Sequence, residues 1–213
     1  MALADALGPR LVGLYLHGSL ATGSWRPGSD VDLLAVLVAA EDDVVVGEVA
    51  AAVDVPAPLE LRVWPSEQPD RDLPVHLTAV AIRGVALVGP PPAEVVPAPP
   101  WEEFLAVLVG DGDRALDAGL GGATPGPAVL TVCRLLATLS SPPGTLFTKE
   151  EAGAWALERL PPEHRPLVAA ALAVRQDPGA AVEWDPEALR RFRTFAVGAA
   201  VRRRPGRKVA GLP

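Results

Sequence analysis

Two aspartates stand one residue apart near the start of the chain, in a run that is otherwise apolar: Asp30-Val31-Asp32-Leu33-Leu34. On a β-strand, residues i and i+2 point to the same face, so both carboxylates would project together. Such a pair repels itself unless a cation lies between the two groups. Mg²⁺ prefers oxygen ligands and keeps positions open for phosphate oxygens and water. Asp30 and Asp32 are therefore predicted to be magnesium ligands.

A Gly-Ser pair, Gly18 and Ser19, comes before the aspartates, separated from them by a loop rich in Gly, Ser and Pro. Glycine lets the backbone approach an anion closely, and the serine adds a hydroxyl group to the backbone N–H groups of the turn. A helix that begins near Ser19 would also direct its N-terminal end toward a phosphate. The turn and the acids together predict a site for metal-assisted phosphoryl chemistry.

A third acid, Glu60, lies in the alternating run Leu59–Trp64 and faces opposite to Leu59 and Leu61. If this strand neighbours the strand of Asp30 and Asp32, Glu60 reaches the same site. It would serve there as a further metal ligand or as the base that takes a proton from an attacking hydroxyl group. Otherwise it is an exposed charge on a strand.

The composition favours a folded protein that works in a reducing compartment. Of the 213 residues, 49% are hydrophobic and 21% are charged, which is enough apolar material for a core. The single cysteine, Cys133, excludes an internal disulfide framework. We expect a cytoplasmic protein, since no signal peptide and no membrane-spanning run is recognisable.

Charge is distributed unevenly along the chain, whose formal net charge is −7. Eight of the 19 Lys and Arg residues follow Leu189, whereas all 26 Asp and Glu residues precede it. An acidic body favours a cationic partner and makes nucleic acid an unlikely one. The basic residues form either a solvated helix end or a docking element: Arg190, Arg191, Arg193, Arg202, Arg203, Arg204, Arg207 and Lys208.

Hydrophobic periodicity predicts an α+β (α/β) protein in two parts. Strands are expected over residues 11–16, 30–38, 59–64 and 80–88, with a helix over 39–53. The proline-rich stretch 89–100 is expected to be irregular, which gives a small mixed-sheet domain (1–97) and an α-helical bundle domain (98–213). Helices are expected over 101–116, 129–139, 149–160, 166–175 and 186–201, with a capping box at Thr148 and Glu151 and a cap at Asp185.

The motifs resemble the polymerase-beta-like nucleotidyltransferase superfamily, and in particular its streptomycin/spectinomycin adenylyltransferases. "LYLHGSLATGSWRPGSDVDLL" is similar to that family's nucleotide-binding segment and "PLELRVW" to its third-acid strand. "VLTVCRLLATL" and "TKEEAGAWALERLPPEHRPLV" resemble its C-terminal helical domain. The resemblance covers about residues 11–175.

The resemblance implies a role for each matching residue. Gly18, Ser19 and Ser29 would contact the ATP phosphates, and Asp30 and Asp32 would bind Mg²⁺. Glu60 matches the catalytic base, which deprotonates the hydroxyl group that attacks the α-phosphorus, and it can also ligate the metal. Two cations of the helical domain match residues that hold the triphosphate: Arg134 and Lys149.

The chain also departs from the family pattern. An acidic residue that faces the antibiotic precedes the "VLT" helix in drug-modifying members, whereas residues 121–127 contain no acid here. The Trp-bearing segment is not recognisable either, although Trp64 or Trp101 can substitute. Other acids stand ready for a cationic drug or form a solvated face: Glu102, Glu103, Asp111, Asp113 and Asp117.

The predicted function is Mg²⁺-dependent transfer of AMP from ATP to a hydroxyl group of a small cationic molecule, an aminoglycoside or aminocyclitol antibiotic, with release of pyrophosphate. One alternative keeps this chemistry but uses a protein or RNA acceptor, as in toxin–antitoxin-type nucleotidyltransferases, with the basic tail for docking. A second alternative is a non-catalytic nucleotide-binding module, against which the presence of all three acids argues.

Overall fold

The computed structural model describes residues 2–26, 28–52, 57–122 and 124–203. The chain divides into two compact units, residues 1–107 and 108–213. The division falls within a helix, ten residues after the boundary at residue 97 that the proline-rich stretch predicts. Among the basic residues near the C-terminus, Arg204, Arg207 and Lys208 lie outside the described residues.

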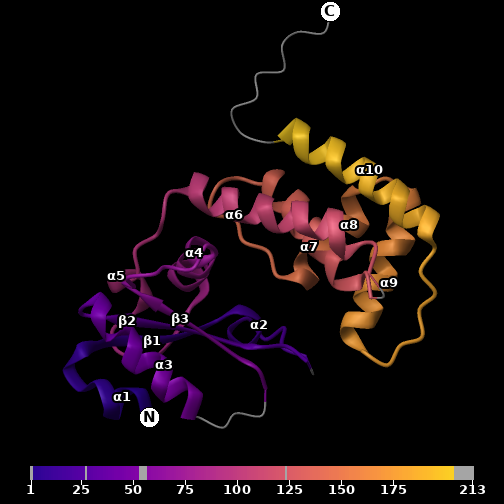
Figure 1. Ribbon diagram of the computed structural model, residues 1–213. Helices are drawn as coiled ribbons and strands as arrows, with labels where there is room; N and C mark the ends of the chain where they lie inside the picture. Colours follow the sequence, from indigo (N-terminus) through magenta and orange to yellow (C-terminus); the bar gives the residue numbers. More distant parts are fainter. Residues whose placement is uncertain (1, 27, 53–56, 123, 204–213) are drawn as a thin grey trace, which may run out of the picture. The chain divides into compact units, whose positions relative to one another are not determined.

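The described part of the first unit contains a mixed four-stranded sheet in the order β3-β2-β1-β4 (Figure 1). β1 pairs antiparallel with β2 and β4, whereas β2 and β3 run parallel. The predicted α+β class is confirmed. The elements of this part are α1 (Ala2–Leu7), η1 (Gly8–Arg10), β1 (Leu11–His17), α2 (Gly18–Ala21), β2 (Val31–Leu37), η2 (Ala40–Asp42), α3 (Asp43–Ala52), β3 (Leu59–Trp64), α4 (Leu73–Arg83), β4 (Val85–Val88) and α5 (Pro92–Val95).

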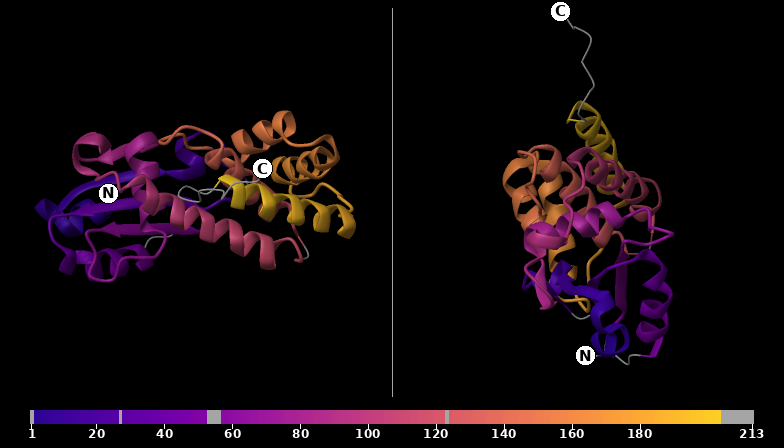
Figure 2. Two further views of the ribbon diagram at one scale, coloured as in Figure 1. Left: turned by 90° about the horizontal axis from the view of Figure 1, so that it is seen from above. Right: turned by 90° about the vertical axis from the view of Figure 1, so that its left-hand side faces the viewer.

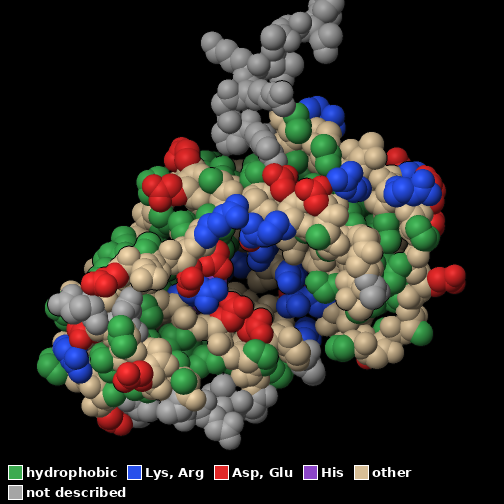
Figure 3. Space-filling model, viewed as in Figure 1, with side chains coloured by type: hydrophobic (Ala, Val, Ile, Leu, Met, Phe, Trp, Pro, Cys, Tyr) green, Lys and Arg blue, Asp and Glu red, His purple; other side chains and the backbone are tan. Residues whose placement is uncertain are grey.

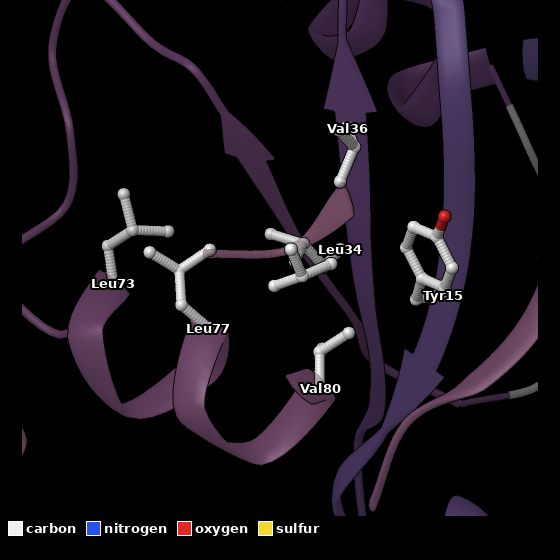
Figure 4. Close-up of a cluster of buried hydrophobic side chains, with 7 residues drawn as sticks. Tyr15, Leu34, Val36, Leu73, Leu77 and Val80 are labelled. Carbon is white, nitrogen blue, oxygen red and sulfur yellow. The ribbon is translucent and has the colours of Figure 1, made fainter. Parts of the chain in front are cut away.

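Helices cover both faces of the sheet, α4 on one side and α1 with α3 on the other (Figure 1). Figure 4 shows the first layer, where Tyr15 and Leu34 point from the strands toward Leu77 and Val80 of α4. The Tyr15 hydroxyl group donates a hydrogen bond to Pro90 O at 3.0 Å. The second layer packs Leu7 of α1 and residues of α3 against the alternate strand positions. Each strand therefore has two buried faces along most of its length.

One predicted strand is partly wrong. The apolar run 80–88 is divided at Gly84: its first part is the last turn of α4, and only Val85–Val88 form β4. α4 begins with Pro74 in its first turn after Asp72, which is a helix-start pattern that the apolar run outweighed in the sequence. The proline-rich stretch also contains one helical turn, α5, which was expected to be irregular.

The second unit consists of helices, as predicted, and Figure 2 shows the orange and yellow helices gathered in one bundle. α6 (Trp101–Arg114) continues into a π-helical turn, η3 (Ala115–Gly119). The further elements are α7 (Gly126–Leu139), α8 (Lys149–Arg159), η4 (Pro162–His164), α9 (Arg165–Gln176) and α10 (Pro186–Arg203). α7 is the central helix, since it contacts η3, α8, α9 and α10.

Both predicted helix caps are confirmed. At the start of α8, Glu151 N donates to Thr148 Oγ1 at 3.1 Å, and Thr148 N donates to the Glu151 carboxylate at 2.7 Å. At the start of α10, Glu187 N donates to Asp185 Oδ1 at 2.8 Å. These bonds satisfy N–H groups that have no partner inside the helix.

Basic residues of α10 are paired with acids, which supports the solvated-helix interpretation for this part of the tail. Arg190 pairs with Glu187, and Arg191 lies 3.5 Å from the same carboxylate. Figure 3 shows basic and acidic side chains beside one another over the start of α10. Arg193 donates to Leu116 O at 2.9 Å and to Asp117 at 2.7 Å, which ties α10 to the π-helical turn. No helix within the described residues is long and apolar enough to span a membrane.

Candidate active site

The turn after β1 brings backbone close to a carboxylate. Gly18 has a φ of +65°, and a Cβ at this position would overlap the Asp32 carboxylate. Thr22 Oγ1 donates to Gly18 O at 3.0 Å, and Ser24 N donates to Ser19 O at 2.9 Å. Glycine is therefore required at position 18 for two reasons, its left-handed backbone and the space taken by Asp32. The predicted phosphate turn and the predicted metal ligand lie against each other.

A short loop leads from this turn to the first aspartate. Ser29 N donates to Arg26 O at 2.9 Å, and Arg26 N donates to Ser29 Oγ at 3.2 Å. These bonds fix the hydroxyl oxygen of Ser29 directly before Asp30. Asp30 immediately precedes β2, and its side chain is half-buried. The hydroxyl proton of Ser29 can still be donated to an anion.

The sheet register places the second aspartate beside Glu60. Asp32 of β2 is the Cα partner of His17 in β1 and of Glu60 in β3. Partners in neighbouring strands project to the same face, and in the adjacent row Tyr15 and Leu34 pack on α4. His17, Asp32 and Glu60 form one row across three strands, which we call the polar row. The condition under which Glu60 can reach the aspartates, neighbouring strands, is met.

The donor chemistry of the polar row suits a hard cation. Asp30, Asp32 and Glu60 offer carboxylate oxygens, which Mg²⁺ prefers, and Gly18 leaves room beside Asp32. The side-chain positions themselves do not converge: across the described ranges, no group of three or more His, Cys, Asp or Glu is close enough to hold a metal ion. The backbone thus aligns the residues, while the carboxylates point apart.

His17 closes the polar row on the side of β1. Its side chain is 3% exposed, and its Nε2 has no hydrogen-bond partner among the residues described. Burial, together with the positive charges of His76 and Arg62, lowers the pKa of His17 to about 3. The imidazole is therefore neutral near pH 7. Its ring meets the edge of the His76 ring at a centroid distance of 5.1 Å.

A network of charges lies beside the polar row; we call it the Arg62 network and define it as Arg62, Asp70, Asp72 and His76. Arg62 Nη2 donates to Asp72 Oδ2 at 3.2 Å, and Nε lies 3.1 Å from Asp70 Oδ2. His76 Nε2 lies 3.2 Å from the same oxygen of Asp72. Burial tends to lower the pKa of Arg62, but the bond to Asp72 and the charges of Asp72, Asp70 and Glu60 raise it above its usual value. Arg62 is permanently charged.

In the second unit, the two predicted triphosphate ligands lie on helices that pack against each other. Arg134 is in the middle of α7, and Lys149 is the first residue of α8, directly after the capping box. Both side chains are half-buried. The start of α8 is also tied to α9, since Arg175 Nε donates to Glu150 at 2.6 Å.

Two families of known proteins match the two parts of this chain. A model of the nucleotidyltransferase domain matches residues 3–71, and a model of the aminoglycoside adenylyltransferase C-terminal domain matches residues 94–198. Aminoglycoside (3'') (9) adenylyltransferases of Klebsiella pneumoniae and Escherichia coli are each 26% identical to it over 76% of this chain, and over 77% and 76% of their own lengths. The chain is a nucleotidyltransferase of the aminoglycoside adenylyltransferase type.

A solved structure has the same fold as this adenylyltransferase-type enzyme. It is the crystal structure of spectinomycin adenyltransferase AAD(9) from Enterococcus faecialis with ATP and spectinomycin. The match has a TM-score of 0.71 at 18% identity and covers 94% of this chain and 95% of that chain. The mixed-sheet and helical parts expected from the sequence are confirmed as one known fold.

Sequence reasoning missed the Arg62 network in this enzyme. Arg62 follows Glu60 by two residues and thus shares its face, a signal that strand alternation already contained. The two tryptophans considered as drug contacts pack locally instead: Trp64 against the α4 core, and Trp101 on Phe104 at a ring distance of 4.4 Å. Of the acids considered for a cationic drug, Asp111 and Asp117 are paired with arginines.

Proposed function

We propose that this enzyme transfers AMP from ATP to a hydroxyl group of an aminoglycoside or aminocyclitol antibiotic and releases pyrophosphate. The observation that carries the proposal is the alignment of Asp32 and Glu60 on neighbouring strands beside the Gly18 turn. The family matches supply the reaction class, and the ATP and spectinomycin bound to the structural neighbour support the choice of donor and acceptor.

In the proposed reaction, Glu60 is the general base. Its side chain is 41% exposed, so an acceptor can reach it, whereas His17 in the same row is buried. The acceptor oxygen forms a bond to the α-phosphorus, and its proton passes to the Glu60 carboxylate. The bond between the α-phosphorus and the oxygen that bridges to the β-phosphate breaks, and pyrophosphate leaves.

Asp30 and Asp32 would hold Mg²⁺, with Glu60 as a further ligand. When bound there, Mg²⁺ supplies the positive charge that offsets the charge of the phosphates and of the transferring group. The chain's own contribution is to place three acids at one end of neighbouring strands. The overlap that a Cβ at Gly18 would make with Asp32 supports a close fit between the turn and this acid.

The remaining proposed ATP ligands are donors of two kinds. Gly18, Ser19 and Ser29 offer backbone N–H and hydroxyl groups to the phosphates. Arg134 and Lys149 offer positive charge to the triphosphate from the helical unit. A cationic acceptor fits the acidic body of the chain, in which every Asp and Glu precedes Leu189.

The test is incubation of the enzyme with α-labelled ATP, Mg²⁺ and a panel of aminoglycosides and spectinomycin. We expect label on at least one antibiotic and a loss of at least about a hundredfold in Asp30→Ala. Asp5→Ala, which removes an exposed aspartate of α1 in the same unit, is the matched control and should keep the rate within about twofold.

Two results count against the proposal. Label on no antibiotic, with ATP binding shown separately, would exclude this acceptor class; a protein or RNA acceptor is then tested in the same assay. Undiminished transfer by Asp30→Ala would overturn the assignment of the metal ligands.

A further inference from the structure

Arg62 occupies a special position relative to the proposed base. It lies two residues after Glu60 on β3, so both side chains project from the same face of the sheet. Asp32 is the neighbour of Glu60 in the polar row, and Leu34 is the neighbour of Arg62 in the next row, which packs on α4. Arg62 therefore stands between the buried apolar layer and the polar row.

The guanidinium group of Arg62 is anchored on the side away from Glu60. Nη2 donates to Asp72 Oδ2 at 3.2 Å, while Nε and Asp70 Oδ2 form a 3.1 Å ion pair that lacks hydrogen-bond geometry. Only 20% of the Arg62 side chain is exposed. A long side chain with two carboxylate partners and little solvent contact has few other positions available.

Asp72 is held in turn by α4. It is the residue that caps this helix, yet its side chain makes no capping bond; its backbone oxygen accepts from Val75 N at 2.9 Å instead. The carboxylate pairs with Arg62 and with His76 Nε2, and the His76 ring rests against buried His17. Hydrogen bonds from Arg62 and His76 and their charges outweigh burial and keep the pKa of Asp72 below its usual value. The anchor is thus rigidly attached to both α4 and β1.

The same Nη2 of Arg62 lies 3.9 Å from Glu60 Oε2. The distance is at the outer limit of an ion pair, so Arg62 attracts the carboxylate without holding it in a hydrogen bond. Since Glu60 is twice as exposed as Arg62, the less mobile partner is the arginine. A fixed positive charge on one side of a half-exposed carboxylate restricts the directions in which that carboxylate points.

We infer that Arg62, anchored by Asp72 and Asp70, is a positioning residue that orients the Glu60 carboxylate for proton abstraction. The inference rests on the proposed role of Glu60 as base. Arg62 does not contact ATP or the acceptor in this assignment; it acts only through Glu60. It follows that losing Arg62 lowers kcat and leaves ATP affinity unchanged, because misplacing a base by about 1 Å costs up to about a hundredfold in rate.

The test is a double-mutant cycle with Arg62→Met, Glu60→Gln and the double variant, assayed with α-labelled ATP, Mg²⁺ and saturating spectinomycin. We expect Arg62→Met to lower kcat about ten- to a hundredfold in the wild-type background and less than twofold in the Glu60→Gln background. ATP binding, measured without acceptor, should stay within twofold. Arg62→Lys keeps a charge near Glu60 and should recover part of the rate.

Arg10→Met is the matched control for a loss of fold. Arg10 also forms an ion pair in the first unit, with Asp42 at 2.8 Å, but it precedes β1, whose opposite end is His17. The strand separates the two by about 20 Å. We expect this variant to keep kcat within twofold even if its thermal midpoint falls as far as that of Arg62→Met.

The cycle separates the possible failures. An equal loss of kcat in both backgrounds, or a loss matched by Arg10→Met, means that Arg62 serves the fold alone and overturns the inference. If the wild-type enzyme labels no acceptor, the proposed function fails instead. Crystal structures then decide the inference: a Glu60 carboxylate turned away in Arg62→Met supports it, and an unchanged one contradicts it.

Discussion

The two faces of the sheet in the first unit differ at one end. On the face covered by α4, the apolar rows of Tyr15 and Leu34 give way to the polar row and Arg62. On the face covered by α1 and α3, the alternate positions stay apolar, and Leu61 and Val63 border a surface hollow of about 210 Å³ beside α3. Residues one position apart on β3 therefore serve different purposes, chemistry at Glu60 and packing at Leu61.

The most severe test of this difference compares neighbours on β3. Glu60→Gln keeps the size of the side chain but removes the proton acceptor, so we expect transfer to fall about a thousandfold with stability nearly unchanged. Leu61→Ala should cost about 1–2 kcal/mol in free energy of unfolding, because it removes half-buried apolar contacts, while kcat stays within a few fold. Labelled-ATP assays and urea unfolding of both variants measure the two effects; the opposite pattern would contradict the assignment of faces.

A second comparison concerns two glycines of the loop that leads to the polar row. Gly18 and Gly23 both have positive φ, +65° and +71°, but a Cβ overlaps Asp32 only at position 18. Gly23→Ala should cost about 1 kcal/mol in stability for backbone strain alone and keep transfer. Gly18→Ala should cost more and lower transfer at least about tenfold, since Asp32 must move. Equal behaviour of the two variants in both assays would show that space beside Asp32 is unimportant.

The smallest effect expected is a dependence of stability on pH that comes from His17. Its pKa is about 3 in the folded protein and about 6.5 when unfolded. The unfolded chain thus binds the extra proton between these values, and stability is complete above about pH 6.5 and falls as the pH drops below it. From pH 7 to pH 5 we expect the wild-type protein to lose about 2 kcal/mol more than His17→Phe in urea unfolding. Parallel losses in both proteins would mean that His17 is not the group responsible.

Local patterns predicted much of the fold, because they report on neighbours in sequence. The strands at 11–16, 30–38 and 59–64 and the caps at Thr148 and Asp185 were each specified by periodicity or by a start pattern. The run 80–88 was misassigned as one strand because an apolar stretch alone does not distinguish a buried helix from a strand. Only Gly84 marks the change.

The candidate site was predictable in its acids and not in their surroundings. Asp30 and Asp32 follow from spacing, whereas the position of Glu60 depends on which strands are neighbours, and periodicity contains no information on strand order. The Arg62 network depends further on how α4 packs on the sheet, since it joins residues of β3, the following loop and α4. The sites of chemistry were thus visible from short-range pattern, and the groups that orient them were not.

The π-helical turn Ala115–Gly119 has a consequence for changes in chain length. A π-helical turn holds one residue more than an α-helical turn. Arg193 of α10 grips this turn through Leu116 O and Asp117. Deleting one residue there would let α6 continue as a regular helix but rotate everything after it by about 100°. This segment therefore tolerates exchange of side chains better than the gain or loss of a single codon.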